Sequence, residues 1–259
     1  MDLKFTGRGA AFNVLEGNTN AYFVENDKMF MIDCGETMFE AIRKRGVLQG
    51  VKEVYVVVSH THSDHCGSLG SFGLYCQFVL QSKLKIVVPH NEVYNEDLRK
   101  LMTIFGNTEN AFELIYEEEL DGKFKAFDSV RYELTKHDHM LTCYSFVFET
   151  HKGGLFYSAD TSTVDNYLRF VETHDCVDKI YMEVTDLNNP WEIHLSLEKL
   201  IATVTPKMKE KVYIMHFRND DCFKKVQEAG FNVVCVDMWK IYWYKAKYWG
   251  IIIVVEFLN

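Results

Sequence analysis

An apolar run that ends in a cluster of histidines constrains this chain more than any other feature. Residues Val54–Val58 are all valine or tyrosine, a pattern typical of a β-strand that is buried on both faces. Such strands occur in α/β folds, where helices cover the sheet. The strand is followed at once by the segment SHTHSDHCG (59–67). The side chains of this segment are therefore expected at the end of a rigid sheet, where strand geometry fixes their positions.

Three imidazoles and one carboxylate in this segment form a dense set of ligands for a borderline metal such as Zn²⁺. His60 and His62 alternate by two and can converge on one ion, whereas Asp64 and His65 follow the turn and can reach a second. A single histidine is more often structural than a ligand. Four such residues directly behind an apolar strand rarely arise for packing reasons, so the segment predicts a metal site.

The order of short strands followed by helices is repeated in the two halves of the chain. In the first half we expect strands and helices in turn at Asp2–Thr6, Asn20–Glu25, Lys28–Asp33, Glu36–Arg45 (helix), Val54–Val58, Gly67–Ser82 (helix), Leu84–Pro89 and Asn91–Phe105 (helix). In the second half the expected strands are Ser129–Lys136, Cys143–Thr150, Gly154–Ser158, Lys179–Val184, Lys211–Met215 and Asn232–Val236, with helices at Ser196–Thr203 and Asp220–Ala229. This order predicts an α/β fold with two mixed sheets packed face to face and helices outside. We expect one domain over residues 1–259.

Composition limits the classes of partner and the cellular location that we expect for this chain. The chain of 259 residues carries a formal net charge of −9, which disfavours a protein that grips a long polyanion. The first fifteen residues contain charges and no apolar signal core, and the seven cysteines form no CxxC pair, so we expect reduced thiols and a cytoplasmic location. The run Tyr248–Val255 is too short to span a bilayer.

Five separated motifs resemble, in order, those of the metallo-β-lactamase fold hydrolases. HTHSDH (60–65) matches the signature HxHxDH, and MIDCGE (31–36) resembles the early D-x-G turn. His139 matches the third histidine by its spacing to Phe146, although His137 is a second candidate. YSADT (157–161) resembles Y-S-G-D-T with alanine in place of glycine, and the histidine after the Lys211–Met215 strand matches the last ligand.

The resemblance implies an αββα sandwich that holds two Zn²⁺ ions, with Mn²⁺ as an alternative. Two ions about 3.5–4 Å apart clamp a substrate and activate a water molecule near neutral pH. One ion would be held by His60, His62, His139 and Asp160, and the other by Asp64, His65, Asp160 and His216, so that Asp160 bridges the two.

Several details resemble the RNase Z-like branch of this fold, which cleaves phosphodiesters. Gly7-Arg8-Gly9 resembles its Gly-x-Gly opening, and the HLS segment that begins at His194 resembles its H-S-T segment. In that branch the corresponding histidine contacts the scissile phosphate and helps to protonate the leaving oxygen, a catalytic role implied here for His194, with Asp64 orienting the attacking water. The tRNA-binding arm of that branch is missing, because a plain hairpin fills the interval from His139 to Asp160.

A phosphodiesterase without a tRNA clamp, on an acidic chain, is expected to act on a small substrate. The chain is similar to small phosphodiesterases of this branch, including the phage anti-Pycsar proteins, and this implies hydrolysis of cyclic nucleotides to nucleoside monophosphates, in the host cytoplasm if the protein is viral. The alternatives are a tRNA 3′-end endonuclease, a lactonase, a β-lactamase or a non-catalytic binding module. No stable nucleic-acid complex and no membrane association are expected.

The aromatic segment 237–259 contains three of the four tryptophans. One interpretation makes it one or two edge strands that close the fold. The other makes it a dimer surface or a base-stacking platform, and so much aromatic surface favours a homodimer.

Overall fold

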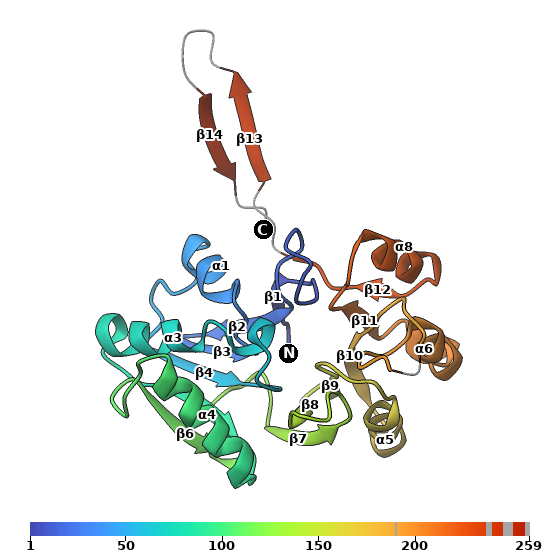
Figure 1. Ribbon diagram of the computed structural model, residues 1–259, viewed down its shortest axis with the longest axis horizontal. Helices are drawn as coiled ribbons and strands as arrows, with labels where there is room; N and C mark the ends of the chain where they lie inside the picture. The colour runs from blue at the N-terminus through green and yellow to red at the C-terminus, as the bar shows by residue number, and fades with distance from the viewer. Residues whose placement is uncertain (190, 237–239, 246–250, 257–259) are drawn as a thin grey trace.

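The computed structural model describes residues 1–189 and 191–236 and the two C-terminal strands 240–245 and 251–256. Two six-stranded mixed sheets dominate it (Figure 1). The first sheet follows chain order and consists of β1 (Lys4–Gly7), β2 (Asn20–Glu25), β3 (Lys28–Ile32), β4 (Glu53–Val57), β5 (Leu84–Val88) and β6 (Phe112–Tyr116). Strands β1 to β3 are antiparallel, and β3 to β6 are parallel.

The second sheet repeats this plan, again with its strands in chain order. Its strands are β7 (Ser129–Thr135), β8 (Cys143–Thr150), β9 (Gly153–Tyr157), β10 (Val177–Glu183), β11 (Val212–Met215) and β12 (Asn232–Val233). Strands β7 to β9 pair antiparallel and β9 to β12 pair parallel. A parallel connection requires a crossover, and helices provide it in both halves.

Helices cover the outer faces of the two sheets, so the αββα sandwich predicted from the sequence is confirmed (Figure 1). Those of the first half are α1 (Met38–Lys44), α2 (Ser63–Cys66), α3 (Leu69–Tyr75) and α4 (Glu92–Ile104). Those of the second half are α5 (Asp165–Thr173), α6 (Leu197–Thr203), α7 (Pro206–Lys209) and α8 (Asp220–Glu228). A turn of π-helix (Cys76–Leu80) follows α3, and a turn of 3₁₀-helix (Glu117–Leu120) follows β6.

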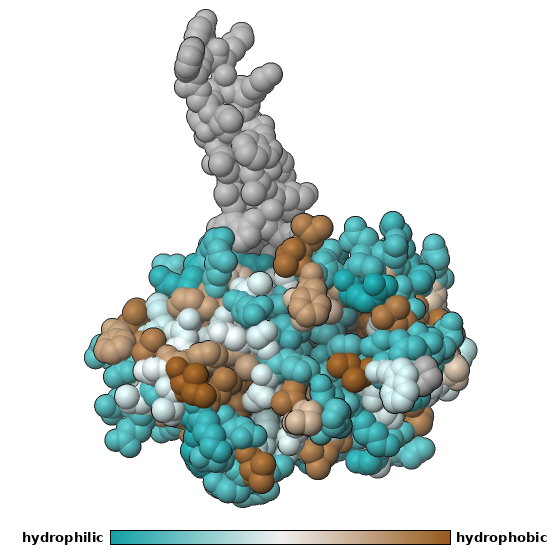
Figure 2. All heavy atoms as spheres, in the orientation of Figure 1, coloured by the Kyte–Doolittle hydropathy of each residue, from teal (hydrophilic) through white to brown (hydrophobic). Residues whose placement is uncertain are grey.

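Two apolar cores hold these layers together. The larger core joins the two sheets, and its rings make edge contacts such as that between Phe30 of β3 and Phe148 of β8, with centroids 5.9 Å apart. The smaller core packs the second sheet against its helices through Phe170 of α5, Leu200 of α6 and Val226 of α8. Burying each such side chain stabilises the fold by about 1.5–3 kcal/mol. The face seen in Figure 2 is mostly hydrophilic, with hydrophobic residues in separate patches.

Three details differ from the sequence prediction. The expected helix Gly67–Ser82 is divided between α3 and the π-turn, and β6 was not predicted. Strands β13 (Lys240–Lys245) and β14 (Ile251–Glu256) pair with each other in a separate two-stranded sheet and do not extend either large sheet, so the edge-strand interpretation is wrong. Val236, just before them, already pairs with Phe5 at the free edge of β1. Residues 237–239, 246–250 and 257–259 of the aromatic segment lie outside the described residues.

Candidate metal centre

The candidate site lies where strands of both sheets end at their carboxyl termini. His60 follows β4, Asp160 follows β9, Glu183 ends β10 and His216 follows β11. In α/β sheets this edge is where ligands bind, because side chains of successive loops converge there. The site therefore combines the two halves of the molecule, which supply it from opposite sheets.

Three histidines form the first group of donor atoms. His60 Nε2 lies 2.9 Å from His62 Nδ1, and His137 Nε2 lies 3.4 Å from the same Nδ1 atom. His137 is held in place because its Nδ1 atom donates to the carbonyl oxygen of Ile193 at 2.9 Å. These three nitrogens are close enough to share one ion.

The structure corrects one predicted ligand. His139, expected from its spacing, exposes 90% of its side chain, and its Nδ1 atom lies 3.5 Å from Asp138 Oδ1. Its place beside His60 and His62 is taken by His137, whose side chain is fully buried. The loop turns after Asp138, whose carboxylate accepts a hydrogen bond from the Met140 amide, and this turn carries His139 away from the cluster.

Two carboxylates and two histidines form the second group. His65 Nε2 lies 3.3 Å from Asp64 Oδ2 and 3.3 Å from Asp160 Oδ1, and His216 Nε2 lies 3.4 Å from each of the same two oxygens. The other oxygen of Asp160 faces the first group, 4.0 Å from His60 Nε2 and 3.9 Å from His137 Nε2. Asp160 thus stands between the two groups, as the sequence predicted for a bridging residue.

Buried partners orient these histidines. Asp33 accepts from His65 Nδ1 at 2.8 Å and from the Ser59 amide at 2.7 Å, which turns His65 Nε2 toward the centre. An imidazole with one nitrogen fixed in this way offers the other as a metal ligand. The MIDCGE motif therefore supplies a supporting carboxylate for the cluster.

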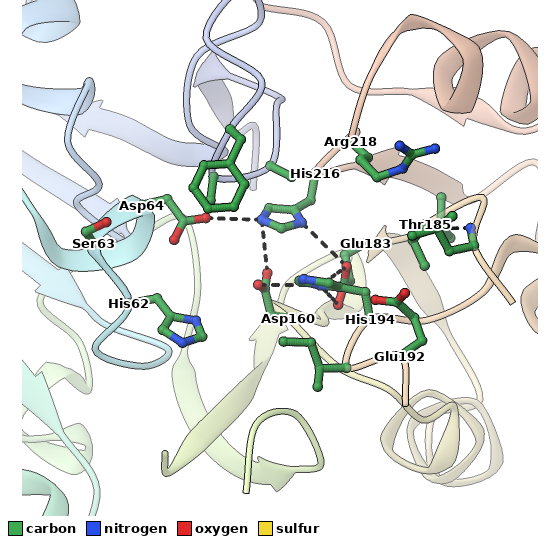
Figure 3. Close-up of a pocket in the computed structure, with 16 residues that line it drawn as sticks. His62, Ser63, Asp64, Asp160, Glu183, Thr185, Glu192, His194, His216 and Arg218 are labelled. Carbon is green, nitrogen blue, oxygen red and sulfur yellow. Dashed lines mark hydrogen bonds and ion pairs between the residues drawn. The ribbon is translucent and has the colours of Figure 1, made fainter. Parts of the chain in front are cut away.

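Glu183 is a functional residue that the sequence reasoning missed. It is fully buried, and its carboxylate contacts His194 Nδ1 at 2.9 Å and lies 3.5 Å from His216 Nδ1 (Figure 3). It also accepts from the Thr161 amide at 2.5 Å. The available signal was an acidic residue in the apolar run IYMEV, since a carboxylate in a buried strand requires partners.

The loop around His194 is tied to the end of β10. The Thr185 amide donates to the carbonyl oxygen of Leu195 at 2.8 Å, and the Leu197 amide donates to that of Thr185 at 2.9 Å. His194 remains 24% exposed and lies 3.7 Å from Asp160, so it borders the cluster and solvent at once. This position is compatible with the predicted contact between His194 and the scissile phosphate, which stays a prediction.

Three residues at the site have left-handed backbone conformations. Asp33, Ala159 and His216 have φ of 63°, 49° and 63°. Residues other than glycine rarely adopt this conformation, and such strain is concentrated at functional sites. All three lie at or just beyond the ends of strands. The left-handed φ turns the chain there, at the edge where the metal-ligand candidates gather.

Charges in the cluster are strongly coupled. Burial opposes the charge on His216 and His194, but Asp160 and Asp64 raise the pKa of His216 to about 10, and Glu183 raises the pKa of His194 to about 9. Burial, reinforced by His65, lowers the pKa of His60 well below its usual value. A neutral imidazole is the form that binds a metal, so His60 is already in that form.

Orphaned donor atoms show that the residues fit a cation. His65 Nε2 and Asp160 Oδ1 are buried, and neither has a hydrogen-bond partner of good geometry within the described part of the chain. Unpaired buried polar atoms are costly, and a cation placed among them would satisfy both. Imidazole and carboxylate are ligands that suit Zn²⁺. Both donor groups therefore fit metal ions.

A cavity of about 330 Å³ opens onto this centre. His62, Asp64, Asp160, His194 and His216, which belong to or border the donor groups, line it (Figure 3). The remainder is lined by Glu183, Glu192, Arg218, Ser63, Thr185 and a set of apolar residues, Ala10, Ala11, Phe12, Val184, Leu187 and Ile193. Its volume is within the range of small-molecule sites. Among the described residues, no helix is long and apolar enough to cross a membrane.

Two solved structures share this fold. The metallo-β-lactamase fold protein YhfI from Bacillus subtilis superposes with a TM-score of 0.66 at 17% identity, covering 89% of this chain and 95% of that one. Human tRNase Z, short form, superposes with a TM-score of 0.61 at 18% identity, covering 92% and 98% of the two chains. The fold is therefore the metallo-β-lactamase fold, with RNase Z-like proteins among its neighbours.

Sequence comparison gives the family. Anti-Pycsar protein Apyc1 from Paenibacillus harenae is 27% identical over 225 residues, 84% of this chain and 90% of the relative. The protein of the same name from Bacillus phage 010DV004 is 25% identical over 251 residues, 87% and 93% of the two chains. The family model for anti-Pycsar protein Apyc1 matches residues 1–240, so this chain belongs to the anti-Pycsar Apyc1 family.

Proposed function

We propose that the protein is a metal-dependent hydrolase, specifically a phosphodiesterase that opens cyclic nucleotides to nucleoside monophosphates. The observation that carries the proposal is the pair of donor groups on either side of Asp160, which lines the cavity. The family name and the RNase Z-like neighbours support it. The ligands proposed for one Zn²⁺ are His60, His62, His137 and Asp160, and those for the other are Asp64, His65, Asp160 and His216.

When bound, such a pair of ions offsets the charge of the phosphate oxygens and supplies an activated water. The chain's own residues complete the chemistry. Burial opposes the charge on Asp64, but His216 and His65 hold its pKa below its usual value, so it stays ionised and can orient the attacking water. His194 keeps its Nδ1 atom on Glu183, which leaves Nε2 to give a proton to the departing ribose oxygen.

A small substrate is favoured over tRNA because the second sheet has no inserted arm. Strands β8 and β9, which precede Asp160, form a tight hairpin with a turn at His151 and Lys152. The cavity of about 330 Å³ suits a mononucleotide better than a folded nucleic acid. Relatives from Bacillus phages support a role in the cytoplasm of a bacterial host, where the family name suggests the removal of an immune signal.

The test is a hydrolysis panel with purified protein after Zn²⁺ or Mn²⁺ loading. We expect turnover of 3′,5′-cyclic nucleotides, about two ions per chain and no cleavage of precursor tRNA. Asp64→Ala should reduce kcat by at least about 10³-fold, because it removes both a ligand and the group that orients water. Asp138→Asn, outside the donor groups, is the matched control. Cleavage of tRNA without cyclic nucleotide turnover would reverse the choice of substrate.

We propose a homodimer as well, because strands β13 and β14 of the aromatic segment join neither large sheet.

A further inference from the structure

One apolar side chain at the cavity has almost no protein neighbours. Phe12 lines the cavity, yet 96% of it is exposed. It lies in the loop between β1 and β2, far in sequence from every metal-ligand candidate. A phenyl ring on the surface is not unusual by itself. An exposed ring that also lines a cavity is, however, in a position to contact a ligand bound there.

The loop that carries Phe12 is firmly built. The Ala10 amide donates to the carbonyl oxygen of Phe217 at 3.0 Å, and the Asn13 side chain donates to the same oxygen at 2.9 Å. The Asn13 amide closes a turn by donating to the Ala10 carbonyl oxygen at 2.9 Å. These bonds fix the backbone on both sides of Phe12 and attach it to the segment that directly follows His216. The ring is therefore held near the metal centre by the main chain and is free on its faces.

The lining of the cavity combines two kinds of residue. Ionisable residues, among them Asp64, Asp160, His216 and Arg218, share it with the apolar Ala10, Ala11, Phe12, Leu187 and Ile193. This combination matches a molecule that contains both an anionic diester and a flat, weakly polar group. A nucleobase fits this description, because every base has a face that stacks on an aromatic ring.

We propose that Phe12 is the stacking platform for the base of the nucleotide substrate. The proposal rests on the proposed cyclic nucleotide activity and adds a binding residue outside the metal-ligand set. Stacking tolerates any base, so the platform selects for the presence of a base and not for its identity. The phosphodiester would meanwhile meet the ionisable donors of the same cavity.

The test compares substrates with and without a base on the metal-loaded full-length protein. The probes are the four 3′,5′-cyclic ribonucleotides and a 3′,5′-cyclic phosphate of ribose that lacks a base. Phe12→Ala should lower kcat/KM for all four nucleotides by about 5- to 150-fold, and Phe12→Trp should restore most of it. Leu15→Ala is the matched control, since Leu15 is 88% exposed on the same loop but does not line the cavity.

Three results of this test would exclude Phe12 as a stacking platform. If Phe12→Ala slows the baseless substrate as much as the nucleotides, Phe12 acts through loop structure or chain association and the platform is excluded. An unchanged kcat/KM for the nucleotides also excludes it, while leaving the proposed function intact. If the wild-type protein hydrolyses no cyclic nucleotide with either metal, the proposed function fails and the platform fails with it.

Discussion

His137 and His139 lie two residues apart, and only the first faces His60 and His62. Sequence spacing could not separate them, because the loop between β7 and β8 contains a turn at Asp138 that no motif specifies. The decisive contact is the hydrogen bond from His137 to the carbonyl oxygen of Ile193, a residue in the opposite part of the chain. Long-range contacts of this kind are what a single sequence leaves open.

The two histidines give a direct prediction about metal affinity. Loss of an outer partner typically costs 10- to 100-fold in metal affinity, so His137→Ala should weaken Zn²⁺ binding by at least about 100-fold. His139→Ala should bind Zn²⁺ like the wild type, since its side chain is 90% exposed. Chelator competition and elemental analysis of both variants measure this. An ion lost from the His139 variant alone would restore the spacing-based assignment.

Ala159 gives a prediction about backbone strain. Its φ of 49° is left-handed, a conformation that costs an alanine about 1–2 kcal/mol and a glycine little. Ala159→Gly also loses a buried methyl and gains unfolded-state entropy, so the expected change in unfolding free energy is near zero. Ala202→Gly in helix α6 should cost about 1 kcal/mol. Urea unfolding of both variants measures the two changes in unfolding free energy. Equal losses would contradict backbone strain at Ala159.

At the scale of elements, the sequence predicted most strands and helices because their patterns are local. The parallel strand β4 was clear from its apolar run, and the helix predicted over Ser196–Thr203 matches α6 with Ser196 as its cap. Strand β6 was missed because Ile115 is the one buried residue in it, which leaves no alternating pattern. Glu183 was missed for a related reason: its role depends on His194 and His216, which reach it from other elements.

Asp186, in the loop after β10, connects that strand to helix α8. Its carboxylate accepts from Arg218 at 2.7 Å and from Lys225 of α8 at 2.8 Å, and its side chain is only 5% exposed. Burial opposes its charge, but Lys225 and Arg218 lower the pKa of Asp186 below its usual value. The charged form of Asp186 therefore contributes to the attachment of α8.

Because the folded-state pKa is lowered, this stability is present above the ordinary carboxyl pKa and is lost as pH falls through the lowered value. Asp186→Asn should reduce the unfolding free energy by about 1 kcal/mol at pH 7, since both cations are partly exposed. The deficit should shrink at pH 3–4. Urea titrations at both pH values measure it, with Asp221→Asn, an exposed residue of α8, as control. A deficit that is independent of pH would assign the effect to shape and not to charge.

At the scale of the whole molecule, the metal centre accounts for part of the charge of −9. Asp33, Asp64, Asp160 and Glu183 are all buried at one place, where bound cations would reverse the local sign. An acidic chain is therefore compatible with a phosphate substrate. The same centre joins the two sheets, because β4 brings His60 and His65 from one side and β9, β10 and β11 bring Asp160, Glu183 and His216 from the other.

Strands β13 and β14 form a sheet of their own, apart from the two large sheets. Among the residues whose side chains the structure describes, all of which lie within 1–236, are the members of both cores and all proposed ligands. A chain that ends after Val236 should therefore keep its metal content and its melting temperature within a few degrees. If segment 237–259 forms the proposed dimer surface, the shortened chain should sediment as a monomer at concentrations where the full chain sediments as a dimer.

Zn²⁺ loading shows whether the chain that ends after Val236 is folded, independently of whether it forms a dimer. A folded short chain responds to Zn²⁺ with a higher melting temperature, because an ion that binds only the folded state stabilises it by about 2.7 kcal/mol at 100 times its Kd. A short chain that shows this response and still sediments as a dimer would place the interface on the two sheets or their helices. A short chain that shows neither cooperative melting nor a Zn²⁺ response would mean that the C-terminal segment is required to hold the sandwich together, as the single-domain prediction over residues 1–259 allows.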